Sequence, residues 1–306
     1  MSPRIRRYFR GRRLTPLIAV TVAALVFTVL LVLVRLRWRP LERADHGAAS
    51  DINNLIAGQH TFVTIVRDVT LLGSTLVLSA VIAAGVILLL LRRQWRLAIY
   101  LAATGAGAFV LDPVLKSLVG RLRPVLAHPV AHAPGNSFPS GHALGSLVCY
   151  GAIYLAFLPA ARGRWRTVFT VVIAVLVAIV GISRILLGVH YLSDVLGGWA
   201  IGVTWLGVTA AAFELSRRAG GRPVTRPVAE GLEPEAAAIS SWLSRNVAGA
   251  GHRAGGPGSP PGSSSRGCCS SAWSSGSVSW SPRRATATSS ATGRSRIGSR
   301  PTARRR

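Results

Sequence analysis

The sequence predicts an all-α, polytopic membrane protein with six transmembrane helices and a disordered, basic C-terminal tail. Half of its 306 residues are apolar, and the mean hydropathy is +0.41. Charged residues make up 15% of the chain, whereas soluble proteins contain about 25%. The chain therefore has too few polar side chains to cover a soluble domain of this size.

Six apolar segments carry this prediction, and each is close to the ~20 residues that a spanning helix requires. They occupy residues 14–34, 70–91, 97–119, 141–160, 167–187 and 195–215. The first is too long for the apolar part of a signal peptide and has no small-residue cleavage site, so we expect a retained helix. The stretch 40–69 is amphipathic and interrupted. Either it lies along the membrane surface or it is a solvated connection.

The placement of arginine predicts the orientation of these helices, because short loops rich in Lys and Arg stay on the cytoplasmic side. Four basic stretches fall on one side if the six segments cross alternately: 1–13, 92–96, 162–166 and 217–218. We therefore expect both termini in the cytoplasm. The arginines between Arg35 and Arg43 are an exception in the first outer loop, but the six N-terminal arginines outnumber them.

Composition divides the chain into a basic cytoplasmic N-terminus (1–13), a six-helix membrane domain (14–218) and a low-complexity cytoplasmic tail (219–306). A short helix is expected around Glu235–Leu243. Beyond residue 248 the tail contains mainly Gly, Ser, Pro, Ala, Thr and Arg and no acidic residue. Such a composition buries too little apolar surface to offset the entropy of ordering, so we expect disorder.

The formal net charge of +26 raises the question of nucleic-acid binding. Most arginines bracket the apolar segments, however, and membrane topology explains them better, so no nucleic-acid partner is expected. Cys149 lies in an apolar run, and Cys268 and Cys269 are adjacent in a Ser/Gly tract. This pattern suggests neither a structural disulfide nor a metal site.

Three polar clusters lie at helix ends on the predicted outer side, where charged groups are costly and mark functional candidates. The first is KSLVGRLRP at 116–124, at the end of the third segment. Lys116 is the only lysine, and the other 35 basic residues are arginine. A lysine retained here suggests a need for a compact point charge. Taken alone, Lys116 is more simply explained as a cation that reaches the membrane interface.

The second cluster is FPSGH at 138–142, directly before the fourth segment. Ser140 and Gly141 at a helix start leave backbone N–H groups unpaired, which suits an anion. His142 then stands in the first turn, beside that anion. In isolation, a simple helix cap with an incidental histidine explains the same residues.

The third cluster is SRILLGVHYLSD at 183–194, between the fifth and sixth segments. His190 and Asp194 are four residues apart, so on a helix they share a face. A carboxylate bonded to one imidazole nitrogen fixes the tautomer and leaves the other nitrogen free to attack. The simpler alternative is a surface His–Asp pair. Alternate spanning places all three clusters on one face, and together they contain the groups that phosphoryl transfer requires.

The three clusters resemble the three-part signature of the type 2 phosphatidic acid phosphatase family, which includes lipid phosphate phosphatases. All eleven signature residues are present in order, and the resemblance covers about residues 50–217. It implies a phosphatase that needs neither a metal ion nor a cofactor. It also implies that His190 is the nucleophile, that Asp194 orients it and that His142 is the acid and base. Phosphate contacts are implied for Lys116, Arg123, Ser140, Gly141 and Arg184.

The resulting hypothesis is hydrolysis of a phosphate monoester or diphosphate on a membrane lipid, at the extracytoplasmic face. Undecaprenyl diphosphate, phosphatidylglycerol phosphate and phosphatidate remain open as substrates, with the bilayer as the other partner. A non-catalytic lipid-binding or carrier protein on the same fold is the alternative, although both histidines are present. We expect Arg121 to support the site or contact the head group. Asp112 either holds Lys116 or merely offsets its charge, and His128 and His132 are expected to be loop residues.

Overall fold

Every regular element is helical in the part of the chain that the computed structural model describes, which is residues 3–223, 225 and 227–234. In chain order the helices are α1 (Pro3–Arg35), α2 (Arg39–Ile56), α3 (His60–Leu71), α4 (Thr75–Leu91), α5 (Trp95–Val119), α6 (Gly141–Phe157), the 3-10 turn η1 (Leu158–Ala160), α7 (Arg164–Leu186), α8 (Leu192–Ala219) and α9 (Pro227–Glu230). The predicted all-α class is confirmed. The short helix expected at Glu235–Leu243 and the rest of the predicted tail lie outside the described residues.

Six helical stretches in the described part are long and apolar enough to cross a membrane. They are Pro16–Arg35, His60–Leu91, Trp95–Val119, Gly141–Ala160, Arg164–Leu186 and Leu192–Ala219. Each contains most of one predicted segment, so the six-span prediction is confirmed. The protein is a multi-pass membrane protein.

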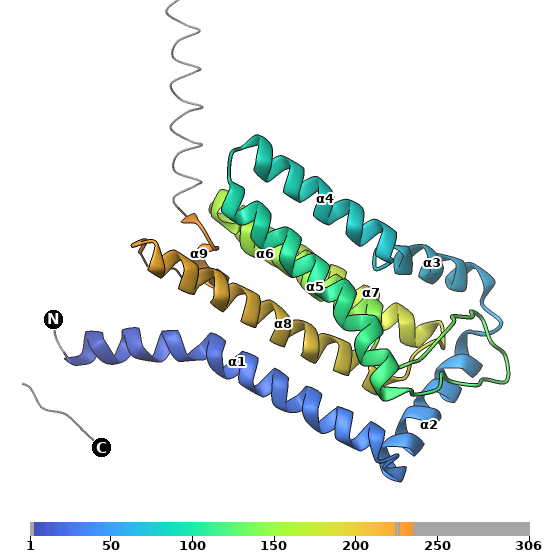
Figure 1. Cartoon of the computed structure of the whole chain (residues 1–306). Coiled ribbons are helices and arrows are strands. Elements are labelled where there is room, and N and C mark those ends of the chain that lie inside the picture. The colour runs from blue at the N-terminus through green and yellow to red at the C-terminus, as the bar shows by residue number, and fades with distance from the viewer. Residues whose placement is uncertain (1–2, 224, 226, 235–306) are drawn as a thin grey trace, which may run out of the picture. The chain divides into compact units, whose positions relative to one another are not determined.

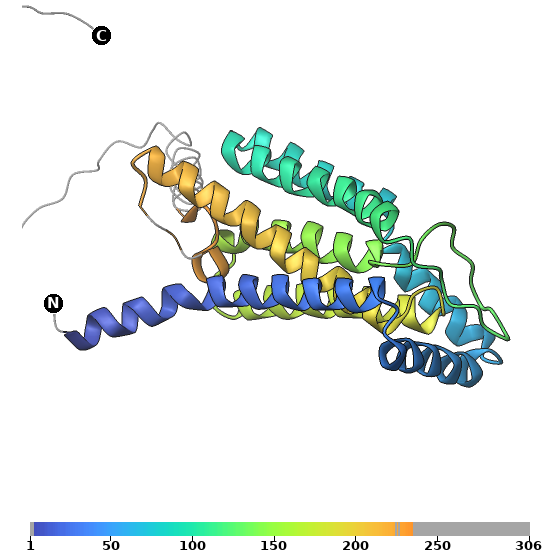
Figure 2. The same cartoon turned by 60° about the horizontal axis from the view of Figure 1, so that its bottom comes forward.

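Helix α6 lies at the centre of the helical bundle and contacts α4, α5, α7 and α8 (Figures 1 and 2). In the most apolar part of the stretch Gly141–Ala160, 61% of the residues are buried inside the protein. The corresponding share for Pro16–Arg35 in α1 is 11%. Helix α1 packs against α8 at the edge of the bundle. The exposed apolar side chains of the outer helices, such as Val22 and Val172, are therefore available to lipid.

Glycines on α8 allow it to approach α6 closely. A Cβ atom on Gly198 would lie 2.7 Å from the carbonyl oxygen of Ser140 and 3.2 Å from the backbone nitrogen of Leu144. One turn later, Gly202 lies against Leu147. Small residues of this kind are typical where membrane helices pack backbone to backbone. They bring the start of α8 directly against the start of α6.

The predicted segment 70–91 begins as the end of one helix and continues as another. Helix α3 ends at Leu71, and α4 starts at Thr75 with the Ser74 hydroxyl accepting the Val77 N–H at 3.4 Å. Between them, a Cβ atom on Gly73 would lie 2.3 Å from Cγ1 of Val180 and 3.1 Å from Cδ2 of His142. The break therefore lies where the chain passes close to α6 and α7.

The amphipathic stretch expected at 40–69 forms α2 and most of α3. Helix α2 lies across the end of the bundle, beside the long connection 120–140 that joins α5 to α6 (Figure 1). Its buried face consists of Asp45, Ala49, Asn53 and Ile56, at helical spacing. This end of the bundle is opposite the one at which α4 turns into α5 (Figure 1).

At that opposite end, residues that follow α8 fold back onto the bundle. Glu214 accepts hydrogen bonds from both the N–H (3.1 Å) and the hydroxyl (2.9 Å) of Thr225. The Leu232 N–H bonds the Leu155 carbonyl at 3.1 Å, and Glu233 lies 3.7 Å from the fully buried Arg217. The described residues up to Pro234 thus pack with the membrane helices, beyond the boundary at 218/219 that composition predicts.

We expect Gly198→Ala to lower the thermal stability of the protein in detergent. The added methyl group would meet backbone atoms of α6, which cannot rotate away, and overpacking of this kind costs about 1–3 kcal/mol. Gly47→Ala is the matched control, because Gly47 is exposed on α2 with nothing within 4 Å of its Cβ position. It should be neutral or stabilising, since Ala is the better helix former. Equal unfolding midpoints for the two variants would contradict close α6–α8 packing.

Candidate active site

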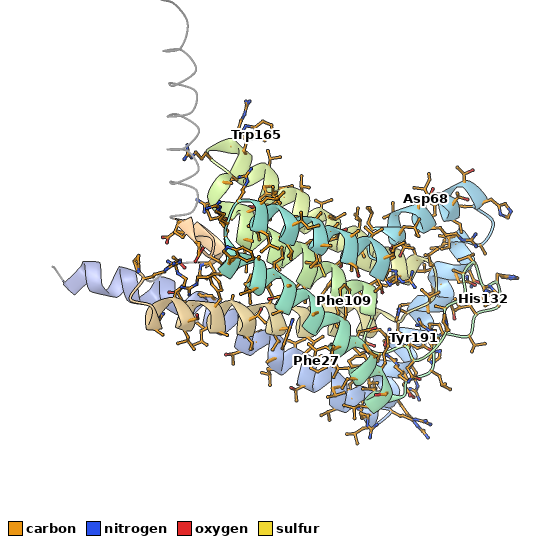
Figure 3. All side chains as sticks on the ribbon, turned by 45° about the horizontal axis from the view of Figure 1, so that its top comes forward. Phe27, Asp68, Phe109, His132, Trp165 and Tyr191 are labelled. Carbon is orange, nitrogen blue, oxygen red and sulfur yellow. The ribbon has the colours of Figure 1, made fainter. Side chains whose placement is uncertain are left out.

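The three sequence clusters meet at one end of the bundle. The imidazole of His142, at the start of α6, interacts electrostatically with four groups from other elements: Lys116, Arg123, Arg184 and His190. These groups come from α5, the 120–140 connection, α7 and the turn before α8. Tyr191 marks this end in Figure 3, with His132 farther out on the long connection. The side chains of Lys116 and His190, which are 74 residues apart in the sequence, are therefore close in space.

His190 lies in the turn between α7 and α8 and is 2% exposed. Its Nε2 atom is 3.1 Å from a guanidinium nitrogen of Arg123, and its Nδ1 atom is 3.5 Å from Oδ2 of Asp194. Burial lowers the pKa of His190 to about 4, although the Asp194 carboxylate opposes this effect. The imidazole is therefore neutral at pH 7, with Nε2 as the acceptor if Nδ1 carries the proton.

The His190–Asp194 pair forms, but in a different way from the predicted shared helix face. Helix α8 begins only at Leu192, so His190 precedes it. The turn before it contains Gly188 in the left-handed region, with φ +66°. Asp194 is the third residue of α8, and its Oδ2 atom accepts the Tyr191 N–H at 2.9 Å. A capping interaction therefore points the carboxylate back toward the turn and His190.

The carboxylate of Asp194 has no exposed surface and is surrounded by donors. Its Oδ2 atom also accepts the hydroxyl proton of Ser137, and its Oδ1 atom is 2.7 Å from Arg121. The main-chain carbonyl of Asp194 accepts the Ser140 N–H at 3.0 Å. One residue of α8 thus connects to the 120–140 connection and to the N-terminus of α6.

The start of α6 presents donors that have no partner within the helix. The first N–H groups of any α-helix lack a carbonyl one turn earlier. The buried hydroxyl of Ser140 makes no hydrogen bond in the described structure, and neither does Nε of the buried Arg184. The other end of the Arg184 guanidinium is held by Oγ1 of Thr70 at 3.0 Å. Such unpaired donors suit an anionic ligand.

Lys116 is held on α5 by Asp112. Its Nζ atom is 2.9 Å from Oδ2 of Asp112, so the contact between these residues is present as the sequence suggested. The same carboxylate lies over the start of α6, because a Cβ atom on Gly141 would be 2.6 Å from Oδ1 of Asp112. Lys116 and Gly141 therefore both lie beside the Asp112 carboxylate.

Arg123 is fixed by carbonyl groups of the surrounding loops. It donates to the carbonyls of Val189 (2.7 Å), Pro134 (3.0 Å) and Gly135 (3.1 Å) in addition to its contact with His190. Burial lowers the pKa of Arg123, and the carboxylates of Asp194 and Asp112 partly offset this effect. The guanidinium remains a cation in front of Nε2 of His190.

Arg121 supports the site, which is one of the two roles that the sequence left open. One of its terminal nitrogens bonds Asp194 and Ser193, each at 2.7 Å, and the other bonds Asp45 at 2.7 Å. Burial alone would lower the pKa of Arg121, but the carboxylates of Asp194 and Asp45 raise it above its usual value.

Asp45, Ser137 and Thr70 are site neighbours that sequence reasoning missed. The sequence does contain a signal for Asp45, because this acidic residue falls at helical spacing with Ala49 and Ile56 on the buried face of α2. Ser137 and Thr70 carry no comparable signal. His128 and His132 lie exposed in the long connection, as expected for loop residues.

The part of the chain that contains the three sequence clusters matches a known protein family. A sequence model of the PAP2 superfamily matches residues 93–218. The phosphatidylglycerophosphatase B of Bacillus subtilis is 33% identical over 146 residues, which are 45% of this chain and 69% of that protein. This chain belongs to the PAP2 superfamily, the type 2 phosphatidic acid phosphatases.

A second relative and a solved structure agree with this family assignment. The undecaprenyl-diphosphatase of Sulfolobus acidocaldarius is 32% identical over 133 residues, which cover 42% of this chain and 60% of that protein. The crystal structure of a transmembrane PAP2 type phosphatidylglycerolphosphate phosphatase from Bacillus subtilis superposes with a TM-score of 0.59 at 25% identity, covering 65% of this chain and 98% of the other. These relatives support a hydrolase that acts on phosphoric esters of lipids.

We expect Asp112→Asn to strengthen inhibition of this PAP2 protein by inorganic phosphate or orthovanadate. Asparagine keeps an oxygen for Nζ of Lys116 but removes a negative charge beside the start of α6, where an anion is expected to bind. The inhibition constant should fall about fivefold, which corresponds to ~1 kcal/mol for two charges about 4 Å apart in a water-like dielectric. Asp68→Asn, the same change at an exposed residue of α3, is the control. Weaker inhibition of Asp112→Asn would contradict the assigned position of its carboxylate.

Proposed function

We propose that this PAP2 protein hydrolyses a phosphate monoester or diphosphate of a membrane lipid through a phosphohistidine intermediate, at the extracytoplasmic face. The observation that carries the proposal is the meeting of two histidines, one at the start of α6 and one in the turn before α8, among three cations. His190 is buried, neutral and backed by Asp194, whereas His142 stands at the start of α6. The attacking and the proton-donating imidazole would thus come from different elements of the fold.

In the first step, Nε2 of His190 attacks phosphorus while the bond from phosphorus to the leaving oxygen breaks. His142 donates a proton to that oxygen, so the lipid leaves as a neutral alcohol or a less charged phosphate. The imidazole of His190 gains positive charge as the N–P bond forms. The Asp194 carboxylate, 3.5 Å from Nδ1, stabilises that charge.

In the second step, His142 removes a proton from water, and the resulting hydroxide attacks phosphorus. The N–P bond breaks, and its electron pair returns to Nε2 of His190. Inorganic phosphate is released, and the proton remains on His142 for the next cycle. No net change in protonation of the protein is required.

Lys116, Arg123 and Arg184 stabilise the charge on the phosphoryl oxygens, together with the Ser140 hydroxyl and the Gly141 N–H. Phosphoryl transfer depends mainly on positioning and on such charge stabilisation. The unpaired donors of Ser140 and Arg184 support this assignment. Loss of one cation is expected to cost about 10²–10³ in rate, by analogy with oxyanion donors.

The distribution of arginine supports the proposed extracytoplasmic face. Arg92 and Arg93 follow α4, Arg162 precedes α7 and Arg166 is in the first turn of α7, all at the opposite end of the bundle from the histidines. Loops rich in arginine stay in the cytoplasm. The histidine end of the bundle would then face the extracytoplasmic side.

We expect His190→Ala to abolish phosphate release, because the proposed N–P bond cannot form without this imidazole. His142→Ala should lower the rate by about 10²–10⁴, the usual value of general acid–base catalysis. Purified protein in detergent with a chelator would be assayed on phosphatidylglycerol phosphate, undecaprenyl diphosphate and phosphatidate. His60→Ala, an exposed histidine on α3, is the control and should retain full activity. Turnover in His190→Ala would refute the phosphohistidine, and a strict Mg²⁺ requirement would contradict the proposed chemistry.

We expect the variant His132→Cys to react with a membrane-impermeant maleimide in intact cells. His132 lies at the histidine end of the bundle and Trp165 at the opposite end (Figure 3). The experiment uses a protein in which Cys149, Cys268 and Cys269 are replaced by serine. Trp165→Cys should then react only after the cells are permeabilised. Labelling in the reverse order would place the site in the cytoplasm.

A further inference from the structure

Helix α2 brings a buried carboxylate to the region behind Asp194. Asp45 is 3% exposed, and its Oδ1 atom accepts the Ser193 N–H at 3.2 Å. Its Oδ2 atom accepts from Arg121 at 2.7 Å and from the Ser193 hydroxyl. All the contacts of this carboxylate are therefore with residues that also surround Asp194.

Arg121 connects the two carboxylates. One terminal nitrogen is 2.7 Å from Oδ1 of Asp194, and the other is 2.7 Å from Oδ2 of Asp45. The guanidinium also lies over the ring of Tyr191, 4.2 Å from its centroid. A planar guanidinium presents two terminal nitrogens in a fixed geometry, one for each acid, whereas an ammonium group presents a single freely rotating nitrogen.

Helix packing alone does not explain an acid at this position. The buried face of α2 would bind the bundle with apolar residues, as Ala49 and Ile56 do. A buried carboxylate is costly unless it is paired. The other polar residue of the face, Asn53, also points to the site end, where it bonds the backbone of His128 through both its amide nitrogen (2.7 Å) and its oxygen (3.2 Å).

We propose that Asp45 is a positioning residue, which orients Arg121 so that Arg121 holds the Asp194 carboxylate against His190. The proposal rests on the proposed role of His190 as nucleophile. Arg121 occupies Oδ1 of Asp194, which leaves Oδ2 directed at His190, the Tyr191 N–H and the Ser137 hydroxyl. Without Asp45, the Arg121 guanidinium keeps its bonds to Asp194 and Ser193 but loses the bond at its other terminal nitrogen, so its orientation against Oδ1 of Asp194 is less constrained.

Asp45 also decides how much negative charge Asp194 presents to His190. The charged and titratable groups that face His190 are Asp194 from α8, Arg123 from the long connection, Arg184 from α7 and His142 from α6. With two carboxylates present, one Arg121 cation cannot neutralise both. Asp194 therefore retains charge to stabilise the imidazolium that forms on phosphoryl transfer.

The test is Asp45→Asn, which keeps the shape of the side chain and removes its charge. Asp51→Asn is the matched control, because it makes the same change at an exposed residue of the same helix. For Asp45→Asn we expect kcat to fall about tenfold. This is by analogy with residues that orient metal-binding side chains, whose loss costs about 10- to 100-fold. KM should stay within about twofold, since the phosphate-binding cations and the α6 start are unchanged. Asp51→Asn should match the wild type in both constants.

The pH dependence separates positioning from a structural effect. If Arg121 neutralises Asp194 more fully in Asp45→Asn, the pKa of His190 falls, and the acid limb of kcat/KM moves to lower pH. The ratio of variant to wild-type kcat/KM should therefore rise as the pH is lowered toward 4. Ionisation of the substrate cancels in this ratio. A ratio that is constant with pH, or a loss confined to KM, would overturn the proposal.

A double-mutant cycle with Arg121→Gln tests whether Asp45 acts through Arg121. We expect Asp45→Asn to have no further effect on kcat in the Arg121→Gln background, because the connection is already lost. Additive losses would overturn the proposal. If Asp45→Asn or Arg121→Gln does not yield folded protein, Arg121→Lys provides the test, and wild-type kcat in that variant would overturn the proposal. Failure of the phosphohistidine mechanism is distinguished by His190→Ala, which does not depend on Asp45.

Discussion

A single buried carboxylate in the first turn of α8 determines how the site is built. Asp194 has no exposed surface and lies at the start of a membrane-spanning helix, where an uncompensated charge is costly. Its compensation comes from Arg121, the Ser137 hydroxyl and the Tyr191 N–H. These groups belong to the long α5–α6 connection and to the turn before α8. Pairing one charge therefore joins two irregular segments to a helix.

The same requirement explains how His190 combines two opposing properties. In the proposed mechanism His190 must be neutral before it attacks, and burial favours this state by lowering the pKa of His190 to about 4. The proposed phosphoryl transfer would then make the imidazole positive, and an isolated buried cation would be costly. The adjacent Asp194 carboxylate reduces that cost. Burial and pairing act in opposite directions on one side chain, and both are supplied by the turn between α7 and α8.

Small residues make this arrangement possible between helices that have no hydrophobic driving force in lipid. Gly198 allows α8 to contact the backbone of α6 at Ser140, and Gly73 allows the α3–α4 break to approach His142. Larger residues at either position would separate the donors of α6 from the groups on α8 and α7. The central position of α6 in the bundle thus depends on glycine at these two positions, because glycine has no Cβ atom.

Much of this protein was determined by local features of the sequence. Six apolar segments predicted six spans, and the spacing of Lys116, His142, Arg184 and His190 predicted the family, because hydropathy and motif spacing are properties of short stretches. The tertiary structure alone decided which groups support them. Asp45 on α2 reaches Arg121 across 76 residues, and α8 begins too late for His190 and Asp194 to share its face. Such contacts depend on how helices pack and where they end, and no short stretch of sequence contains that information.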